Sequence, residues 1–405
     1  MTLTRPLVAG VITALVGFGS SFTVVLAGLR AVGADPAQAT SGLLAVSVAA
    51  GVAALVLGLR SRLPISIAWS TPGAALLISS GVPAGGFPAA VGAFLLCGLL
   101  IVVAGLVRPL GRLIAAIPTP LASAMLAGVL LPLCLAPVRA LGEVPGLAAP
   151  VIVVWALATR FARLWAVPAA LVVTVIALAF TGPDLTGADL LPTPVWVAPT
   201  FEPLTLLSLG LPLFLVTMAS QNIPGMAVLA QYGFRPPLRP ILLVTGALTM
   251  LAAPFGGHAV NLAAISAALA AGDDAGPRER RWIASVTAGL GLAVLGLGAG
   301  LATALILIAP PVLVQAVAGL ALIGALASSL TAAVGDHGRR EAAVVTFAVT
   351  AAGVAFLGIG SAFWGLIAGA AMLLLRPRRT AAPTATTAPP PAATPTTEPG
   401  RHRRE

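Results

Sequence analysis

Apolar stretches long enough to cross a lipid bilayer recur along the whole chain, and they constrain its fold more than any other feature. A membrane-spanning helix needs about 20 mostly apolar residues, and only helices or closed barrels satisfy every backbone polar group inside the hydrocarbon. Charged residues make up only 8% of the chain, against about 25% in soluble domains. The sequence therefore predicts an all-α polytopic membrane protein. Fourteen segments are predicted: 6–29, 39–59, 65–82, 88–107, 119–137, 146–160, 165–181, 204–231, 238–253, 255–271, 282–308, 311–334, 341–357 and 359–375.

The net charge of +10 comes from arginines, which cluster at the ends of alternate apolar segments. The predicted outer loops hold only Arg30 and Arg139, and by the positive-inside rule this places both chain termini in the cytoplasm. No basic face carries interleaved aromatic residues, so nucleic-acid binding is not expected. The arginines on the predicted cytoplasmic side are Arg60, Arg62, Arg108, Arg112, Arg160, Arg163, Arg235, Arg239, Arg278, Arg280, Arg281, Arg339, Arg340, Arg376, Arg378 and Arg379.

A weak internal repeat divides the chain into two halves. The sequence AVGADP at 31–36 follows the first span, and QYGFRP at 231–236 follows the eighth. Seven spans separate equivalent elements, and because seven is odd the two halves must have opposite orientations. The predicted organisation is a first inverted repeat at 1–181, an outer connection at 182–203, a second repeat at 204–375, and an Ala/Pro/Thr-rich disordered cytoplasmic tail at 376–405.

The third span contains the first of two polar, Gly/Pro-rich interruptions. Residues 65–70 are β-prone and follow Pro64, Thr71 is a good N-cap, and Pro72 suits the first helical position. This predicts a short extended piece that leads into a half-helix starting near residue 71, followed by Gly73.

The tenth span contains the second interruption, at residues 252–261. Pro254 breaks the helix, Gly256 and Gly257 permit close backbone approach, and a half-helix is predicted to begin around His258. In an inverted repeat the two half-helix N-termini would meet near the midplane. Each would carry about half a positive charge and free N–H donors, so together they predict an anion site.

His258 is the only ionisable group, apart from the cysteines, predicted at membrane depth. A buried histidine can be a hydrogen-bonded structural residue, whereas intramembrane ionisable groups mark functional sites by default. An incoming carboxylate would favour protonation of His258, and protonation would favour carboxylate binding equally. This predicts proton–anion coupling, with Asn261 one helical turn after His258 on the same face.

Further polar residues interrupt the first and eighth spans, at Gly19–Ser21 and at 220–225. Interhelical hydrogen bonds or a proline kink would also explain them. The predicted substrate-binding residues are Ser20, Trp69, Ser70, Thr71, Pro72, Gly73, Ser220, Gln221, Asn222, Phe255, Gly256, Gly257 and Asn261, with His258 as the proton-coupling residue. No metal site and no cofactor are predicted.

Four motifs resemble the benzoate/proton symporter family of bacterial inner membranes: residues 68–75, 211–225, 253–265 and 358–365. The resemblance runs from about residue 5 to 375 and implies uptake of benzoate or a similar aromatic carboxylate with a proton. The family is similar to nucleobase and sulfate/bicarbonate transporters. That similarity implies seven-plus-seven inverted repeats, a core domain of spans 1–4 and 8–11, a gate domain of spans 5–7 and 12–14, and a possible homodimer.

The relatives that carry nucleobases use acidic residues in spans eight and ten, where this chain has Gln221, Asn222 and His258. The resemblance to the benzoate symporters implies an inner-membrane symporter for an aromatic monocarboxylate, whose ring would pack on apolar walls and on Trp69 or Phe255. Another organic anion or a nucleobase remains an alternative substrate, and an anion channel is an alternative class. An enzyme is not expected, because the sequence contains no metal-binding helix and no Ser/His/Asp constellation.

Overall fold

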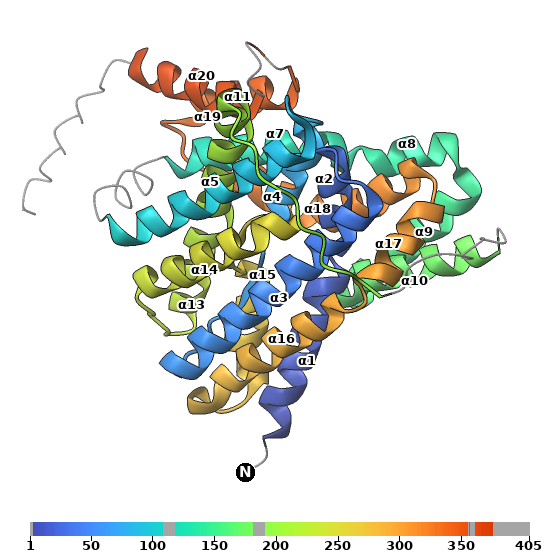
Figure 1. Cartoon of the computed structure of the whole chain (residues 1–405), viewed down its shortest axis with the longest axis vertical. Helices are drawn as coiled ribbons and strands as arrows, with labels where there is room; N and C mark the ends of the chain where they lie inside the picture. Colours follow the sequence, from blue (N-terminus) through green and yellow to red (C-terminus); the bar gives the residue numbers. More distant parts are fainter. Residues whose placement is uncertain (1–2, 108–117, 181–190, 355, 357–360, 376–405) are drawn as a thin grey trace, which may run out of the picture.

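The computed structural model describes residues 3–107, 118–180, 191–354, 356 and 361–375, and these residues are mostly helical (Figure 1). The predicted tail at 376–405 lies outside them. The first half contains α1 (Thr4–Gly19), α2 (Phe22–Ala31), α3 (Pro36–Ser61), β1 (Ile67–Trp69), α4 (Thr71–Ser80), α5 (Gly86–Leu106), α7 (Thr119–Cys134), α8 (Ala136–Glu143), α9 (Pro145–Phe161) and α10 (Ala166–Ala179). The second half contains α11 (Pro203–Thr205), α12 (Leu211–Thr217), α13 (Ile223–Gln231), α14 (Leu238–Ala252), β2 (Val260–Leu262), α15 (Ala264–Ala271), α16 (Arg281–Gly296), α17 (Ala299–Ile308), α18 (Pro311–Val334), α19 (Arg340–Ala351) and α20 (Ser361–Leu375).

Each of the fourteen predicted segments coincides with a helix or a broken helix, which confirms the predicted fold class. By length and composition, seven helical stretches of the described chain could cross a membrane, and α9, α10 and α20 are shorter apolar helices. Two features were not predicted. The short helix α8 follows α7 directly, and the eleventh segment is divided into α16 and α17.

The third span is broken as predicted, but its half-helix is capped by Ser70 and not by Thr71. Ser70 has an extended backbone, and its Oγ accepts a hydrogen bond from the Gly73 N–H at 3.1 Å. Thr71 is therefore the first helical residue and Pro72 the second. Proline is tolerated in this first turn because its missing N–H would have no helical partner there.

In the tenth span, the prediction that a half-helix begins around His258 is wrong. A 3₁₀ turn (Ala253–Phe255) ends at Gly256, whose φ of 85° lies in the left-handed region that glycine adopts freely. The chain then runs extended through His258 into β2, and α15 begins only at Ala264. Asn261 therefore lies in a strand and not one helical turn after His258. The local sequence missed this because β2 obtains its hydrogen bonds from β1, about 190 residues away in the chain.

The eighth span is not interrupted at 220–225, contrary to prediction. The chain stays helical from Pro203 to Gln231 and contains two wide π-turns, Leu206–Gly210 and Met218–Asn222. In the second π-turn, the Ile223 N–H donates to the Met218 carbonyl, five residues back. Pro224 follows at once, so the wide turn falls where proline removes a helical donor. Single π-turns of this kind occur often at functional sites.

Two groups of helices can be distinguished by their packing contacts. In one group α3 packs on α16 and α14, and α14 packs on α5; in the other α7 packs on α18 and α19. The contact between α3 and α16 (spans 2 and 11) has its counterpart between α14 and α5 (spans 9 and 4), as an inverted repeat requires.

Both of these equivalent contacts are made by glycines. Gly51 of α3 faces Gly289 of α16, and Gly98 of α5 faces Gly246 of α14. Helices in membranes associate through such small residues because the backbones can then approach closely.

Replacing Gly51 should therefore destabilise the protein. The Cβ of a Gly51→Ala variant would lie 2.6 Å from the Gly289 carbonyl oxygen. Overpacking of this kind costs about 1–3 kcal/mol. We expect a lower melting temperature for the purified variant in detergent. Gly324→Ala is the matched control, since that helical glycine of α18 has no atom near its Cβ position. Equal melting of the two variants would contradict the close crossing.

Candidate functional site

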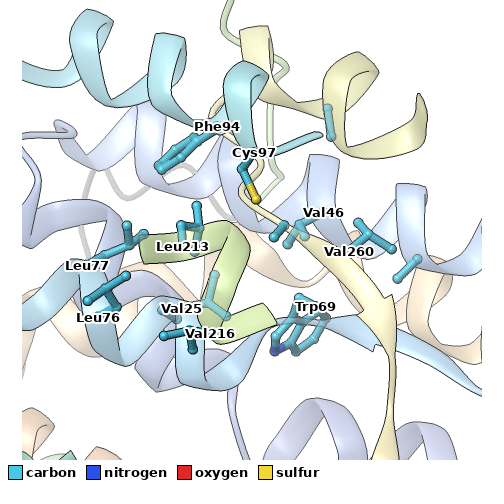
Figure 2. Packing of buried hydrophobic residues seen from close by; sticks show 14 of the residues in the cluster. Val25, Val46, Trp69, Leu76, Leu77, Phe94, Cys97, Leu213, Val216 and Val260 are labelled. Carbon is cyan, nitrogen blue, oxygen red and sulfur yellow. The ribbon is translucent and has the colours of Figure 1, made fainter. Parts of the chain in front are cut away.

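The centre of the molecule is an antiparallel ribbon made by the two broken spans. Ile67 pairs with Leu262, Ala68 with Asn261, and Trp69 with Val260. Two more hydrogen bonds extend it, from Ser70 N–H to the Ala259 carbonyl (2.8 Å) and from Ala263 N–H to the Ser66 carbonyl (3.0 Å). Figure 2 shows Trp69 and Val260 on the two strands among buried apolar side chains. The pairing supplies the backbone partners that a broken helix loses.

Side chains from neighbouring spans satisfy the outer edge of β2. The Val260 N–H donates to the Thr249 hydroxyl of α14, and the Leu262 N–H donates to Asn222 Oδ1, each at 3.0 Å. Asn222 is fully buried, and its amide nitrogen contacts the Met218 sulfur at 3.2 Å. Asn222 thus satisfies a backbone N–H on the outer edge of the ribbon.

The Asn261 side chain also serves the ribbon. It is fully buried, and in the amide orientation that satisfies its hydrogen bonding it donates to the Leu262 carbonyl at 2.9 Å and accepts from the Ser70 N–H at 3.3 Å. Both predicted asparagines therefore have their amide oxygens occupied by backbone N–H groups.

The N-terminus of α4 lies at one end of the ribbon. Ser70 Oγ accepts from the Gly73 N–H and from the Thr217 hydroxyl of α12, the latter at 2.9 Å. Pro72 has no N–H, and Thr71 is partly exposed. The α15 N-terminus lies at the opposite end, because antiparallel strands send their following helices in opposite directions. The prediction that two helix N-termini converge at residues 71 and 258 is therefore wrong.

His258 contacts the start of α4 from the other half of the chain. Its ring is fully buried, and its Nε2 lies 3.1 Å from the Ser70 carbonyl oxygen, which also accepts the Ala74 N–H. A carbonyl only accepts hydrogen bonds, so Nε2 carries the hydrogen. Nδ1 is buried without a partner within the described chain, and the Phe94 ring packs edge-on at 6.4 Å between centroids.

Trp69 and the break in the first span form a second contact. The Trp69 indole N–H donates to Ser21 Oγ at 3.0 Å, and its ring packs edge-on against Phe18. Trp69 is only 2% exposed, so its ring is part of the packed core. Ser20, which precedes Ser21 in the chain, is partly exposed, and its hydroxyl donates to the Gly17 carbonyl at 3.2 Å.

The ring of Phe255 has a different aromatic partner from that of Trp69. It packs edge-on against Trp196 and lines an apolar cavity of about 280 Å³ between α3 and α14. Gly256 and Gly257 are buried in the turn that follows, and the prediction of close backbone approach there is confirmed. A Cβ added to Gly42 of α3 would lie 2.6 Å from the Gly256 carbonyl oxygen.

Four predicted polar residues keep partly exposed side chains: Ser20, Thr71, Ser220 and Gln221. The Ser220 hydroxyl is bonded to the Val216 carbonyl within its own helix. Gln221 and Thr71 differ, because neither side chain has a hydrogen bond within the described chain. They are the polar groups near the ribbon that are most available to a ligand. In the same part of the chain no three His, Cys, Asp or Glu side chains group as metal ligands.

Three hydroxyl residues of the site were not predicted as binding residues: Ser21, Thr217 and Thr249. Each lies in an apolar span and bonds to the ribbon or to the α4 cap. The only sequence signal was a polar residue within a span, which is equally typical of a hydroxyl bonded to its own helix.

The chain matches a known family over most of its length. The family described as benzoate membrane transport protein matches residues 2–375. The inner membrane protein YdcO of Escherichia coli is 39% identical over 90% of this chain and 93% of its own length. The benzoate membrane transport protein of Acinetobacter baylyi is 31% identical over 92% of this chain and 95% of its own length.

Two solved structures have a similar fold. The transmembrane domain of the cyanobacterial bicarbonate transporter BicA superposes with a TM-score of 0.59 at 16% identity, covering 90% of this chain and 98% of that one. SLC26A9 superposes with a TM-score of 0.62 at 14% identity, covering 93% of this chain and 66% of that one. At these identities the likeness shows the fold alone, and it confirms the predicted inverted repeat.

The contrast between Asn222 and Gln221 is testable. Asn222→Ala leaves the buried Leu262 N–H without a partner, a loss of about 1–3 kcal/mol. Gln221→Ala removes no hydrogen bond within the described chain. We expect a clearly lower melting temperature for Asn222→Ala and an unchanged one for Gln221→Ala, measured on purified protein. The reverse order would show that Asn222 does not hold the ribbon.

Proposed function

Because the chain belongs to the benzoate membrane transport protein family, we propose that it imports benzoate or a similar aromatic carboxylate together with a proton. It is a multi-pass membrane protein of a bacterial transporter family, and a relative is an inner membrane protein. The bacterial inner membrane, with both termini in the cytoplasm, is therefore the proposed location. The observation that carries the proposal is the start of α4 beside the buried ribbon, where the Thr71 donors are left open by the Ser70 cap.

The carboxylate would bind at the start of α4. A helix N-terminus offers free N–H groups and about half a positive charge. Pro72 has no N–H and the Gly73 N–H is used by the Ser70 cap, so Thr71 presents the first backbone donor. The Thr71 N–H and hydroxyl have no hydrogen-bond partner in the described residues. Two adjacent donors at a positive helix end suit a monocarboxylate.

Other predicted residues would contact the rest of the substrate. Gln221 and Ser220 lie on the π-turn that packs against both β2 and α7, and Ser20 lies at the break of the first span. The aromatic ring would pack on apolar walls between the two helix groups. Trp69 would support the site from the packed core, because almost none of its ring is exposed.

The proton would bind His258 at Nδ1. That atom has no partner in the described residues, while Nε2 is held on the Ser70 carbonyl. A proton there places a full positive charge beside the N-terminus of α4. Charge at this position favours an anion at Thr71, and by linkage the anion favours the proton equally. Proton and carboxylate would thus bind together without any basic residue in the ribbon.

Transport would follow from movement between the two helix groups. Spans 1–4 and 8–11 would form the core that carries the ribbon, and spans 5–7 and 12–14 would form the gate. Packing within each group supports this division: α3 packs with α16 and α14, and α7 packs with α18 and α19. A homodimer is part of the proposal.

Uptake into proteoliposomes tests the function directly. With an inward proton gradient, we expect labelled benzoate to accumulate above its equilibrium concentration and a protonophore to abolish the accumulation. Unlabelled benzoate should compete, whereas uracil and bicarbonate should not. Competition only by uracil or by a non-aromatic anion would reassign the substrate. Flux without accumulation would indicate a channel.

A glutamine at position 258 tests the coupling. His258→Gln keeps an N–H donor for the Ser70 carbonyl but cannot take up a proton. We expect proton-driven accumulation to fall at least tenfold, while exchange of labelled for unlabelled benzoate continues in the absence of a gradient. Full proton-driven accumulation by this variant would remove His258 as the coupling residue.

A further inference from the structure

The connection between the two halves is anchored to the rest of the molecule at three points. Residues 191–202 run without helix across the molecule toward α11, drawn as a green coil in Figure 1. The Val195 N–H donates to Ser41 Oγ (2.8 Å), the Val197 N–H to the Pro254 carbonyl (2.7 Å), and the Thr200 N–H to the Pro88 carbonyl (3.0 Å). All three anchors lie on the group of helices that carries the ribbon.

Ser41 is the residue at which this connection meets the site. It lies on α3 and is 1% exposed. Its Oγ accepts from the Val195 N–H and donates to the Phe255 carbonyl at 2.9 Å; the other acceptor within reach, the Val195 carbonyl, lies at 3.4 Å. One hydroxyl therefore joins α3, the connection and the turn at 253–257.

That turn leads directly to His258. Gly42, next to Ser41 on α3, packs so closely on the Gly256 carbonyl that no Cβ would fit. The face of α3 thus holds the turn by one hydrogen bond and by one close contact. Phe255 lies three residues before His258, whose Nε2 bonds to the Ser70 carbonyl at 3.1 Å. A shift of the turn would move His258 along the start of α4.

We propose that Ser41 is a positioning residue of the transport site: it fastens the 191–202 connection to the 253–257 turn and so holds His258 against Ser70. The hydroxyl suits this role because it accepts from one backbone group and donates to another, which alanine cannot do. The role in transport rests on the proposed function, whereas the fastening of the turn does not.

The first test is hydrogen exchange measured by mass spectrometry on the purified full-length protein. We expect Ser41→Ala to speed exchange in peptides covering 253–262. Ser47→Ala is the matched control, because Ser47 is as buried on α3 and, within the described residues, its hydroxyl bonds only to the Leu43 carbonyl of its own helix. Val195→Pro removes only the hydrogen bond from the connection and leaves the Ser41 hydroxyl donating to the Phe255 carbonyl, so it should speed exchange less than Ser41→Ala does. Unchanged exchange in both test variants would overturn the fastening.

The second test is the concentration dependence of proton-driven benzoate uptake. We expect Ser41→Ala to raise KM about tenfold, which corresponds to about 1.4 kcal/mol of binding free energy, and Ser47→Ala to change it less than twofold. In exchange assays without a gradient, the effect of Ser41→Ala should shrink in a His258→Gln background, because coupled residues are not additive.

The two tests separate the claims. Faster hydrogen exchange in Ser41→Ala with an unchanged KM for benzoate would overturn the positioning role. Absence of benzoate uptake by the unsubstituted protein would contradict the proposed function, and the exchange experiment would then decide the fastening by itself.

Discussion

The pairing of two short strands, one from each broken span, is the interaction on which the rest of the structure depends. Within an apolar span, each backbone N–H and C=O that leaves a helix must find another partner. The two interrupted spans provide those partners for each other through the 67–262, 68–261 and 69–260 pairs. Neither break would be stable alone, so the site exists only when both halves of the chain have folded together.

A two-stranded ribbon still has unpaired outer edges, and the surrounding helices complete it. Thr249 and Asn222 accept the free N–H groups of β2, Thr217 supports the Ser70 cap, and Ser21 holds Trp69. These side chains come from spans 9, 8 and 1. These polar side chains of the apolar spans are therefore hydrogen-bonded to the ribbon or its cap. Few polar side chains near the ribbon, chiefly Thr71 and Gln221, remain available to bind a substrate.

The arrangement also places partial positive charge at the proposed site without an arginine or lysine there. The N-terminus of α4 supplies partial positive charge, and the cap from Ser70 leaves the Thr71 donors free. His258 reaches the same cap from the opposite half of the chain. A carboxylate bound at the start of α4 and a proton bound at His258 would thus both act on Ser70, which caps the helix and contacts the histidine.

The sequence by itself determined the number and order of the spans, the two breaks and the residues that form them, because apolar length, Pro and Gly act locally. From the sequence, the cap of α4 was predicted at Thr71 instead of Ser70, a helix was predicted to begin at His258, and Asn222 and Asn261 were predicted to bind substrate. Only the tertiary structure decided these points. Residues 258–263 become extended because β1 offers hydrogen bonds from the other half of the chain, and both asparagine amides are used by backbone groups brought near by folding. Partners so distant in sequence leave no local pattern.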